Sequence, residues 1–321
     1  MRMKKNIHEE LIDVLKDHTQ EGENTVDVLT DIIPISKEAA YRRLRGDIQF
    51  TLEEAVLIVE KTGISLDKIL NIDKKGQYVF HAQSIFSEDP YEKYCRQMQE
   101  LTSIYVHVKK DPDAMMYFAG NSLLALFYMS YEMTNKYAFL KWLYHMPNVN
   151  GVPTRLKDIV IPDKVINIQR KLLQEIDQTN YCLIIDKNVV SSFIKEIQYF
   201  VAAGLIMPEE VAVLKQEIAL MLDRIEATAI SSCSSTGKQR ILYICNSYLE
   251  GNYSVLRGMG TEVAFIYLYD INQFNCYDTR LYKNQMSWIE SIIGFSTLIS
   301  GCGILPRIQF LTRQREKLSS L

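Results

Sequence analysis

The chain has 321 residues, of which 47% are hydrophobic and 23% are charged, and its formal net charge is −3. The hydrophobic fraction is ordinary for a folded protein and argues against extensive disorder, and the length favours two domains over one. The negative charge argues against a protein that coats nucleic acid generally, because nucleic-acid binders normally carry a basic surface.

Two amphipathic helices are predicted at the start of the chain. The first covers residues 7–15, which place apolar side chains at helical spacing. The second has an apolar stripe over residues 26–33 and follows Asn24, a residue type that caps helix N-termini well. Pro34 has no N–H to donate, so the second helix ends there and the chain turns a tight corner.

A third helix is predicted over residues 36–45, and it concentrates positive charge. Ser36 is a favoured N-cap, and Gly46 suits the left-handed conformation that often ends a helix. Ala40 and Leu44 lie one turn apart and can face a core. The side chains that fall roughly opposite that pair on an ideal helix are Glu38, Tyr41, Arg42 and Arg45.

Two further short helices follow. Residues 51–54 read Thr-Leu-Glu-Glu, a capping box that opens a helix with apolar residues at 55, 56, 58 and 59 and an end at Gly63. Residues 65–70 begin another helix. The sequence therefore predicts five short helices in about seventy residues.

This order of elements, over residues 6–71, resembles the phage lambda repressor-like helix-turn-helix family of the Cro/repressor kind. Residues 26–33 match the scanning helix of that family, 34–35 the turn, 36–45 the recognition helix, and 63–70 the usual ending. The chain has Pro34 where the turn usually carries glycine, and Thr30 where the scanning helix usually carries alanine. The resemblance implies a five-helix domain that binds double-stranded DNA.

The resemblance places the DNA contacts on the third helix and just after it. Arg42 and Arg45 are the best candidates to pair with guanine, because arginine can bond guanine O6 and N7 together. Glu38 could accept a hydrogen bond from a cytosine amino group. Arg43, on the flank of the helix, and Gln49 are expected to meet phosphate. The predicted DNA-binding residues are Ser36, Lys37, Glu38, Tyr41, Arg42, Arg43, Arg45 and Gln49.

The charge of the N-terminal region limits this interpretation. Residues 1–75 contain 12 Lys and Arg and 15 Asp and Glu, whereas residues 36–46 contain four basic residues and one acid. Positive charge is thus confined to the predicted recognition helix, which suits a specific regulator and predicts strongly salt-dependent binding. Two alternatives stay open: a solvated charged helix in an ordinary bundle, and a module that binds a protein partner instead of DNA.

The boundary between the domains falls between two polar breaks, at residues 73–77 and 87–90. We therefore assign residues 1–75 to the helix-turn-helix domain, 76–89 to a linker and 90–321 to a larger domain. Aromatic residues are concentrated in this larger domain, since only Tyr41 and Phe50 precede residue 76.

The larger domain is predicted to have an α+β fold with more helix than strand. Helical patterns cover residues 91–110, 122–146, 162–178, 188–203, 208–230 and 278–300, and the charged tail at 313–317 is expected to be frayed. Strand patterns cover residues 114–119, 181–185, 240–249, 253–259 and 262–269, and the last three are expected to form a meander.

Two loops in this domain have a faint functional signature. Residues 232–239 echo a phosphate-binding loop, but Ser232 replaces the first glycine and Gln239 follows the lysine, so we interpret the segment as a flexible loop. Gly258 and Gly260 flank one residue between two strands, which is typical of a turn or bulge and leaves close approach by a ligand as the alternative.

The aromatic segment from 117 to 144 admits two interpretations. It could form a core and a dimer interface, which we prefer, or it could line a pocket for an apolar or aromatic effector. Composition does not separate the two. The residues concerned are Tyr117, Phe118, Phe127, Tyr128, Tyr131, Tyr137, Phe139, Trp142 and Tyr144.

Catalysis, metal binding and membrane insertion are not expected. The five histidines show no metal-ligand spacing, the six cysteines form no Cys-x-x-Cys pair, and nothing selects a catalytic triad, so we expect neither an enzyme nor a cofactor. The apolar stretch 291–305 is shorter than the roughly twenty residues of a spanning helix and reads as a buried helix end. The N-terminus reads as charged helix and not as a secretory signal, so free thiols in a reducing cytoplasm are expected.

Together these patterns predict a sequence-specific, DNA-binding transcription regulator. The first domain would bind operator DNA, and the second would form a homodimer and sense a candidate small-molecule effector. An enzyme built on the α+β domain is a third interpretation, which a deep pocket with convergent polar groups would support.

Overall fold

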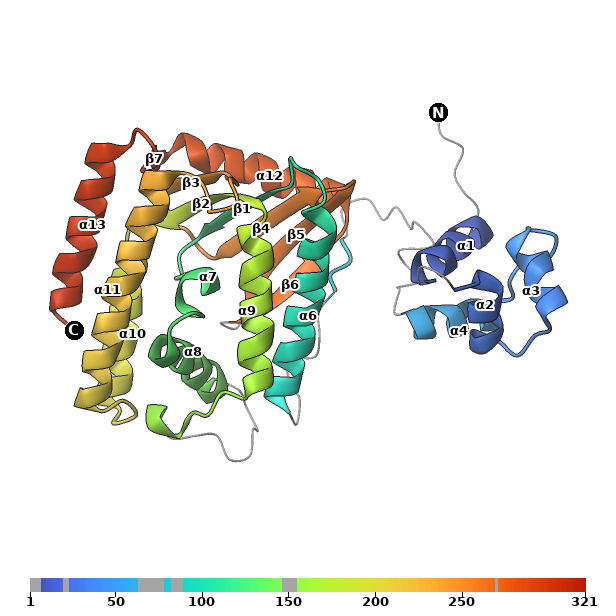
Figure 1. Ribbon diagram of the computed structural model, residues 1–321, viewed down its shortest axis with the longest axis horizontal. Helices are drawn as coiled ribbons and strands as arrows, with labels where there is room; N and C mark the ends of the chain where they lie inside the picture. The colour runs from blue at the N-terminus through green and yellow to red at the C-terminus, as the bar shows by residue number, and fades with distance from the viewer. Residues whose placement is uncertain (1–6, 20–22, 63–77, 82–88, 146–154, 269–270) are drawn as a thin grey trace. The chain divides into compact units, whose positions relative to one another are not determined.

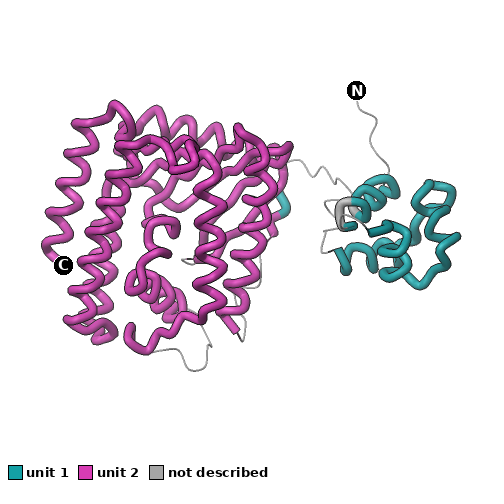
Figure 2. The backbone as a smooth tube through the Cα atoms, in the orientation of Figure 1, with its two compact units in different colours: residues 1–79 teal, residues 80–321 magenta. Residues whose placement is uncertain are grey.

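The computed structural model describes residues 7–19, 23–62, 78–81, 89–145, 155–268 and 271–321. The chain divides into two compact units, residues 1–79 and residues 80–321 (Figure 2). His81 already belongs to the second unit, because its backbone forms an antiparallel bridge with Asn275.

Unit 1 is a bundle of short helices around a small apolar core. The core takes residues from all four described helices, among them Leu15, Leu29, Ala40 and Ile58, each with none of its surface exposed. The fifth predicted helix, at 65–70, lies outside the described residues. The helices are α1 (Ile7–His18), α2 (Thr25–Ile32), α3 (Lys37–Leu44) and α4 (Leu52–Thr62) (Figure 1).

The ends of these helices follow the capping signals in the sequence. The Asn24 side chain accepts a hydrogen bond from the Val26 N–H at 3.0 Å, so it caps α2. Thr51 and Glu54 form both bonds of a capping box at the start of α4: Thr51 N–H donates to Glu54, and Glu54 N–H donates to the Thr51 hydroxyl. Both predicted caps are therefore confirmed.

Unit 2 is built on one mixed sheet of seven strands in the order β6-β5-β4-β1-β2-β3-β7. β1, β2 and β3 run parallel to one another, and every other neighbouring pair is antiparallel. The predicted α+β class is confirmed. The strands are β1 (Met115–Gly120), β2 (Asn180–Asp186), β3 (Arg240–Cys245), β4 (Asn252–Gly258), β5 (Thr261–Leu268), β6 (Asn272–Cys276) and β7 (Ser296–Leu298).

Helices cover the two faces of this sheet unequally. Because side chains alternate along a strand, Met116 and Phe118 enter the large core under most of the helices, and Met115 and Ala119 enter a smaller core with α12. Figure 1 shows α6 and α9 side by side over the sheet. The helical elements are α6 (Pro90–Val108), α7 (Ala125–Tyr128), α8 (Glu132–Tyr144), the 3₁₀ turn η1 (Leu156–Asp158), α9 (Asp163–Asp177), α10 (Val189–Ala202), α11 (Pro208–Ser231), α12 (Thr279–Gly294) and α13 (Ile304–Ser319).

The aromatic segment contributes mainly to the large core. Phe127, Tyr137, Phe139 and Trp142 are each at most 2% exposed, whereas Tyr144 is 46% exposed. Phe139 contacts Trp142 and Tyr94 in edge-to-face geometry, with ring centroids 5.9 and 5.0 Å apart. The preferred interpretation of these rings as core therefore holds for the buried residues of α7 and α8.

The single long helix predicted over residues 122–146 is wrong. The structure has α7 and α8 there, separated by residues 129–131. The N-terminus of α8 is capped by Glu217 of α11, whose carboxylate accepts hydrogen bonds from the N–H groups of Met133 and Thr134 at 3.0 and 2.7 Å. A cap supplied from another helix permits a new helix start that the local sequence does not signal.

The C-terminal end of the chain also differs from expectation. The predicted helix 278–300 ends at Gly294, and β7 follows it and pairs with β3. The tail 313–317, expected to be frayed, lies within α13, where Gln314 is 2% exposed and its side chain donates to the Lys187 carbonyl. β6, which completes the meander, was not predicted.

Candidate nucleic-acid interface

α3 is held in unit 1 by one face and presents the other to solvent. Ala40 is fully buried, and Leu44, one turn later, packs partly buried against the same core. The Ser36 hydroxyl caps the helix by accepting from the Ala39 N–H at 3.2 Å. Gly46 ends this region with φ +84°, a conformation that side chains other than glycine seldom adopt.

The structure brings seven of the eight sequence-predicted site residues to the solvent. Tyr41, for example, is 49% exposed even though it is a large aromatic residue. The side chains predicted to lie opposite Ala40 and Leu44 are the exposed ones, as helical geometry requires. The exposed residues are Ser36, Lys37, Glu38, Tyr41, Arg42, Arg45 and Gln49.

Two of the exposed cations have surface partners. Lys37 pairs with Asp27 at 2.5 Å, and Arg45 pairs with Asp47 at 3.3 Å. The hydrogen bond and charge of Asp27 raise the pKa of Lys37, so this side chain stays cationic. All four side chains are at least half exposed. Exposed pairs contribute little to stability, so a phosphate or base edge can replace the carboxylates readily.

Arg42 differs from its neighbours. It is exposed, and its guanidinium has no hydrogen-bond or ion-pair partner among the residues that the structure describes. A guanidinium is always charged and has five donors in a planar fork, a geometry that matches guanine and phosphate. Arg42 is therefore the side chain on α3 that is most available to an external acceptor.

Arg43 is the exception among the predicted site residues. Its side chain is 13% exposed and forms a bidentate pair with Glu54 of α4, at 3.0 and 2.7 Å. The same Glu54 also closes the capping box with Thr51. The expectation that Arg43 meets phosphate is therefore replaced by a structural role, because this guanidinium fixes α3 against α4.

A residue that the sequence did not single out fixes α3 from the other side. His8 of α1 is 7% exposed and lies between two backbone groups. Its Nδ1 accepts from the Phe50 N–H at 3.2 Å, which leaves Nε2 protonated to donate to the Arg43 carbonyl at 2.9 Å. Both contacts span more than thirty residues of sequence, so no local signal identifies them.

The Arg43–Glu54 pair gives a prediction for acid conditions. Burial raises the pKa of Glu54, but the hydrogen bonds from Arg43 and Thr51 and the charge of Arg43 outweigh burial and hold the pKa below 4.5. An acid with a lowered pKa stabilises the fold above its unfolded pKa and loses that contribution as the pH falls through its folded pKa. We expect Glu54→Gln to destabilise unit 1 by about 2 kcal/mol at neutral pH and by much less at pH 3.

Amide exchange of α3 and α4 in the full chain measures this difference without requiring unit 1 to unfold separately. The matched control is Glu53→Gln, one position earlier on α4 and exposed, which should change exchange little at either pH. Equal effects of Glu54→Gln at pH 3 and pH 7 would contradict the ionic role of this pair.

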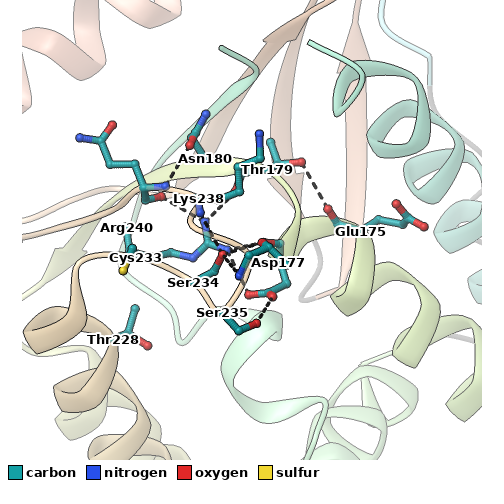
Figure 3. Close-up of polar contacts among 12 residues, drawn as sticks. Glu175, Asp177, Thr179, Asn180, Thr228, Cys233, Ser234, Ser235, Lys238 and Arg240 are labelled. Carbon is teal, nitrogen blue, oxygen red and sulfur yellow. Dashed lines mark hydrogen bonds and ion pairs between the residues drawn. The ribbon is translucent and has the colours of Figure 1, made fainter. Parts of the chain in front are cut away.

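The segment that echoes a phosphate-binding loop is closed by its own hydrogen bonds (Figure 3). The Ser234 hydroxyl accepts from the N–H groups of Thr236 and Lys238, and Gln239 N–H donates to the Asn180 side chain. These N–H groups are not directed at an external anion. The loop is a tied hairpin in place of the flexible loop expected from the sequence, and the phosphate interpretation has no support from its geometry.

Arg240, directly after this hairpin, is the best-bonded cation of unit 2. It is 2% exposed and donates to the carbonyls of Thr179, Asp177 and Gln239 at 2.7, 2.7 and 3.1 Å (Figure 3). It also pairs with the Asp177 carboxylate at 3.0 Å and lies 4.1 Å from the centre of the Tyr181 ring. Arg240 therefore joins β3 to the start of β2 and the end of α9.

Gly258 and Gly260 have the geometry of a turn. Met259 and Gly260 adopt positive φ angles of 51° and 75° between β4 and β5. A Cβ at Gly258 would lie 2.8 Å from the Val108 carbonyl oxygen, so the glycine allows close approach of protein backbone. The turn interpretation is confirmed.

Within the described ranges, no three His, Cys, Asp or Glu side chains gather as a metal site would require. All six cysteines are free thiols, with Cys95, Cys182, Cys245 and Cys276 buried. No helix in the described part of the chain is long and apolar enough to cross a membrane. Comparisons with protein-family models, curated proteins and solved structures found no match to this chain.

Proposed function

We propose that the protein is a sequence-specific DNA-binding transcription regulator of the lambda repressor-like helix-turn-helix type, and that α3 is its recognition helix. The observation that carries the proposal is that three neighbouring arginines have different environments. Arg42 and Arg45 are exposed on one face of α3, whereas Arg43 forms an ion pair with Glu54 of α4. A helix that enters a groove needs exposed donors and a fixed orientation, and these residues supply both.

The roles of the exposed residues follow from their chemistry. Arg42 and Arg45 would pair with guanines in the major groove, and Glu38 would accept from a cytosine amino group. Lys37 lies in the first turn of α3, where this class of motif meets base edges, and Tyr41 would contact DNA one turn later on the same face. Gln49 and Ser36 would contact the phosphate backbone and so fix the position of the protein along the DNA duplex.

The proposal includes a homodimer assembled through unit 2. A single module of this size buries little DNA surface, so specific affinity normally needs two half-sites. Supporting this, unit 2 exposes apolar side chains at the edge of its sheet: Ile304, Leu305 and Ile308 on α13 are 57%, 65% and 51% exposed, and Phe295 before β7 is 64% exposed. Exposed apolar clusters of this kind are typical of interfaces. The proposed location is the cytoplasm, a reducing compartment that suits the free cysteines.

Selection of bound sequences from random duplex DNA tests the proposal with the full chain. We expect a single enriched motif with two inverted half-sites whose centres lie about 10 base pairs, roughly 34 Å, apart. Failure to enrich any motif would overturn the assignment of DNA binding. A single asymmetric half-site would overturn the dimer while keeping the recognition helix.

A protein-binding module is the second candidate, and specific observations favour it. Asp27 and Asp31 lie near Lys37 and weaken the positive field of α3, and Leu52 and Val56 expose apolar surface one turn apart on α4. The salt dependence of DNA affinity separates the two candidates. For a DNA regulator, the logarithm of the binding constant should fall with the logarithm of the salt concentration, with a slope of about 0.9 for each phosphate contact. A protein-binding module would bind DNA weakly and at no specific site.

A further inference from the structure

Two cavities of unequal size adjoin each other in unit 2. The outer one has a volume of about 1030 Å³, and the inner one has a volume of about 110 Å³. They have wall residues in common, so they lie directly beside each other. The residues that line both cavities are Ser122, Leu123, Tyr128, Asn252, Tyr267 and Ile271.

The outer cavity lies where the parallel strands end. Gly120 ends β1 and Asp186 ends β2, and the cavity is lined by Asn121 directly after β1 and by Asp186 and Asn188 at the end of β2. Ligands of open α/β sheets bind outside the carboxyl ends of strands, where successive connections diverge. The connections here diverge in that way, because the chain adds β2 and β3 on one side of β1 and then places β4 on the other side.

The connection from β3 to β4 is held over these strand ends by polar contacts. The buried Asp186 carboxylate accepts from the N–H groups of Asn188 and Leu249 at 2.7 and 3.2 Å. Asn121 donates to the Leu249 carbonyl at 2.7 Å. A Cβ at Gly120 would lie 2.2 Å from the Asn252 side chain, so glycine is needed to form this wall. These contacts therefore fix the rim of the outer cavity.

The inner cavity is apolar and small. Side chains of α6, β1 and α7 line it, among them Leu101, Leu126 and three methionines at 98, 116 and 129. An apolar cavity of about 150 Å³ can hold benzene. This one is smaller, so a short branched alkyl group fits it directly and a phenyl ring fits when the three flexible methionines yield slightly. Methionine side chains adapt their shape to such groups.

The outer cavity is polar but has no excess of either charge. Its ionisable lining consists of three lysines (141, 195 and 317) and three acids (186, 196 and 250). Lys141 and Glu196 already pair with each other at 3.0 Å. The Ser191 hydroxyl is buried on the wall without a hydrogen-bond partner among the described residues, and a buried polar group of this kind is normally satisfied. A neutral or zwitterionic polar group matches this lining better than an ion of one sign.

From these observations we infer that unit 2 binds a small amphipathic molecule that has one compact apolar group and a polar part of no net charge. The apolar group occupies the inner cavity among the methionines, and the polar part lies at the carboxyl ends of β1 and β2. An amino acid or short peptide with an aromatic or branched side chain has this chemistry. The inference concerns unit 2 alone and stands whether or not α3 binds DNA.

Methionine-methyl NMR of the full chain tests the inference with four probes that share a phenyl ring: benzyl alcohol, phenylalanine, benzoate and benzylamine. The neutral and zwitterionic probes should shift the methyl signals of Met98, Met116 and Met129, with dissociation constants on the order of 1 mM. Met221 is buried on α11 and lines neither cavity, so its signal is the internal control. Benzoate and benzylamine should bind at least threefold more weakly.

Filling the inner cavity should weaken the binding of the probes. Leu101→Phe and Ala125→Leu both enlarge lining residues and keep the three methionines, and each should weaken binding at least tenfold. Leu214→Phe, at a buried position on α11 outside both cavities, is the matched control for overpacking. The inference is overturned if neither neutral-headed probe shifts the three signals, if Met221 shifts equally, if binding survives both filling variants, or if a singly charged probe binds best.

Discussion

Replacing Arg42 and Arg45 together with alanine is expected to abolish specific DNA binding while leaving unit 1 folded. Each bidentate contact to guanine contributes about 1–3 kcal/mol of discrimination, so the double variant should lose about 2–6 kcal/mol, roughly 30-fold to 20,000-fold in affinity. Both side chains are exposed and neither belongs to the apolar core, so the stability of the bundle should change little. Titration of the selected DNA site with each protein, at one fixed salt concentration, measures the loss.

The matched control removes the same charge from other helices. Lys16 of α1 and Lys61 of α4 are exposed, and their double alanine variant should weaken binding only slightly. Equal losses in both double variants would mean that bulk charge and not the α3 surface holds the DNA. Full retention of specific binding by the folded Arg42 and Arg45 variant would refute the assignment of α3 as the recognition helix.

The second large effect concerns stability, at Arg240 in unit 2. Arg240→Met keeps most of the side-chain volume but removes the two 2.7 Å bonds to the carbonyls of Thr179 and Asp177, and the first of these bonds is buried. Hydrogen bonds from a charged donor contribute about 1.5–3 kcal/mol each, so losing both should cost about 3–6 kcal/mol. For a unit of this size, we expect the melting temperature of unit 2 to fall by roughly 6–24 °C. Differential scanning calorimetry of the full chain measures the change.

Arg315→Met is the control for this substitution. Arg315 also pairs with two acids, Asp223 and Glu226, but its side chain is 41% exposed. Exposed pairs contribute at most about 1 kcal/mol, so the control should melt within a few degrees of the unaltered protein. If both variants melt together, the contacts of Arg240 do not stabilise the sheet as its geometry indicates.

Local signals predicted the helices of unit 1 well. Ser36, Asn24 and the capping box at 51–54 are short-range features, and each cap forms as expected. The exposed face of α3 also follows from helical periodicity alone. These features depend on residues within four positions of one another, so the local sequence is sufficient to predict them.

The scaffold behind α3 was not predictable in the same way. Arg43 was expected to meet phosphate because it lies on the flank of the predicted recognition helix, yet its partner, Glu54, lies on the next helix. His8 is 35 residues from the carbonyl it bonds. Such contacts depend on how the helices pack, and a single sequence has no periodic pattern that reveals them.

Unit 2 shows the same limit on a larger scale. The start of α8 depends on a carboxylate from α11, and β7 exists as a strand because β3 lies beside it. The two cavities combine residues from β1, β2 and β4 and the helices around them, although the aromatic segment indicated that a pocket was one alternative. Non-local pairing decides these features, and local propensity then becomes a minor factor.

The attachment of α3 has a consequence for attempts to transplant its sequence preference. Its backbone is anchored to α1 through His8, and its flank is anchored to α4 through Arg43 and Glu54. A chimaera that received residues 36–46 alone would keep the exposed side chains of α3 and lose the two contacts that fix its orientation. Exchanging only the exposed residues of α3, with both anchors left intact, is the more direct way to change the DNA sequence that the protein is proposed to bind.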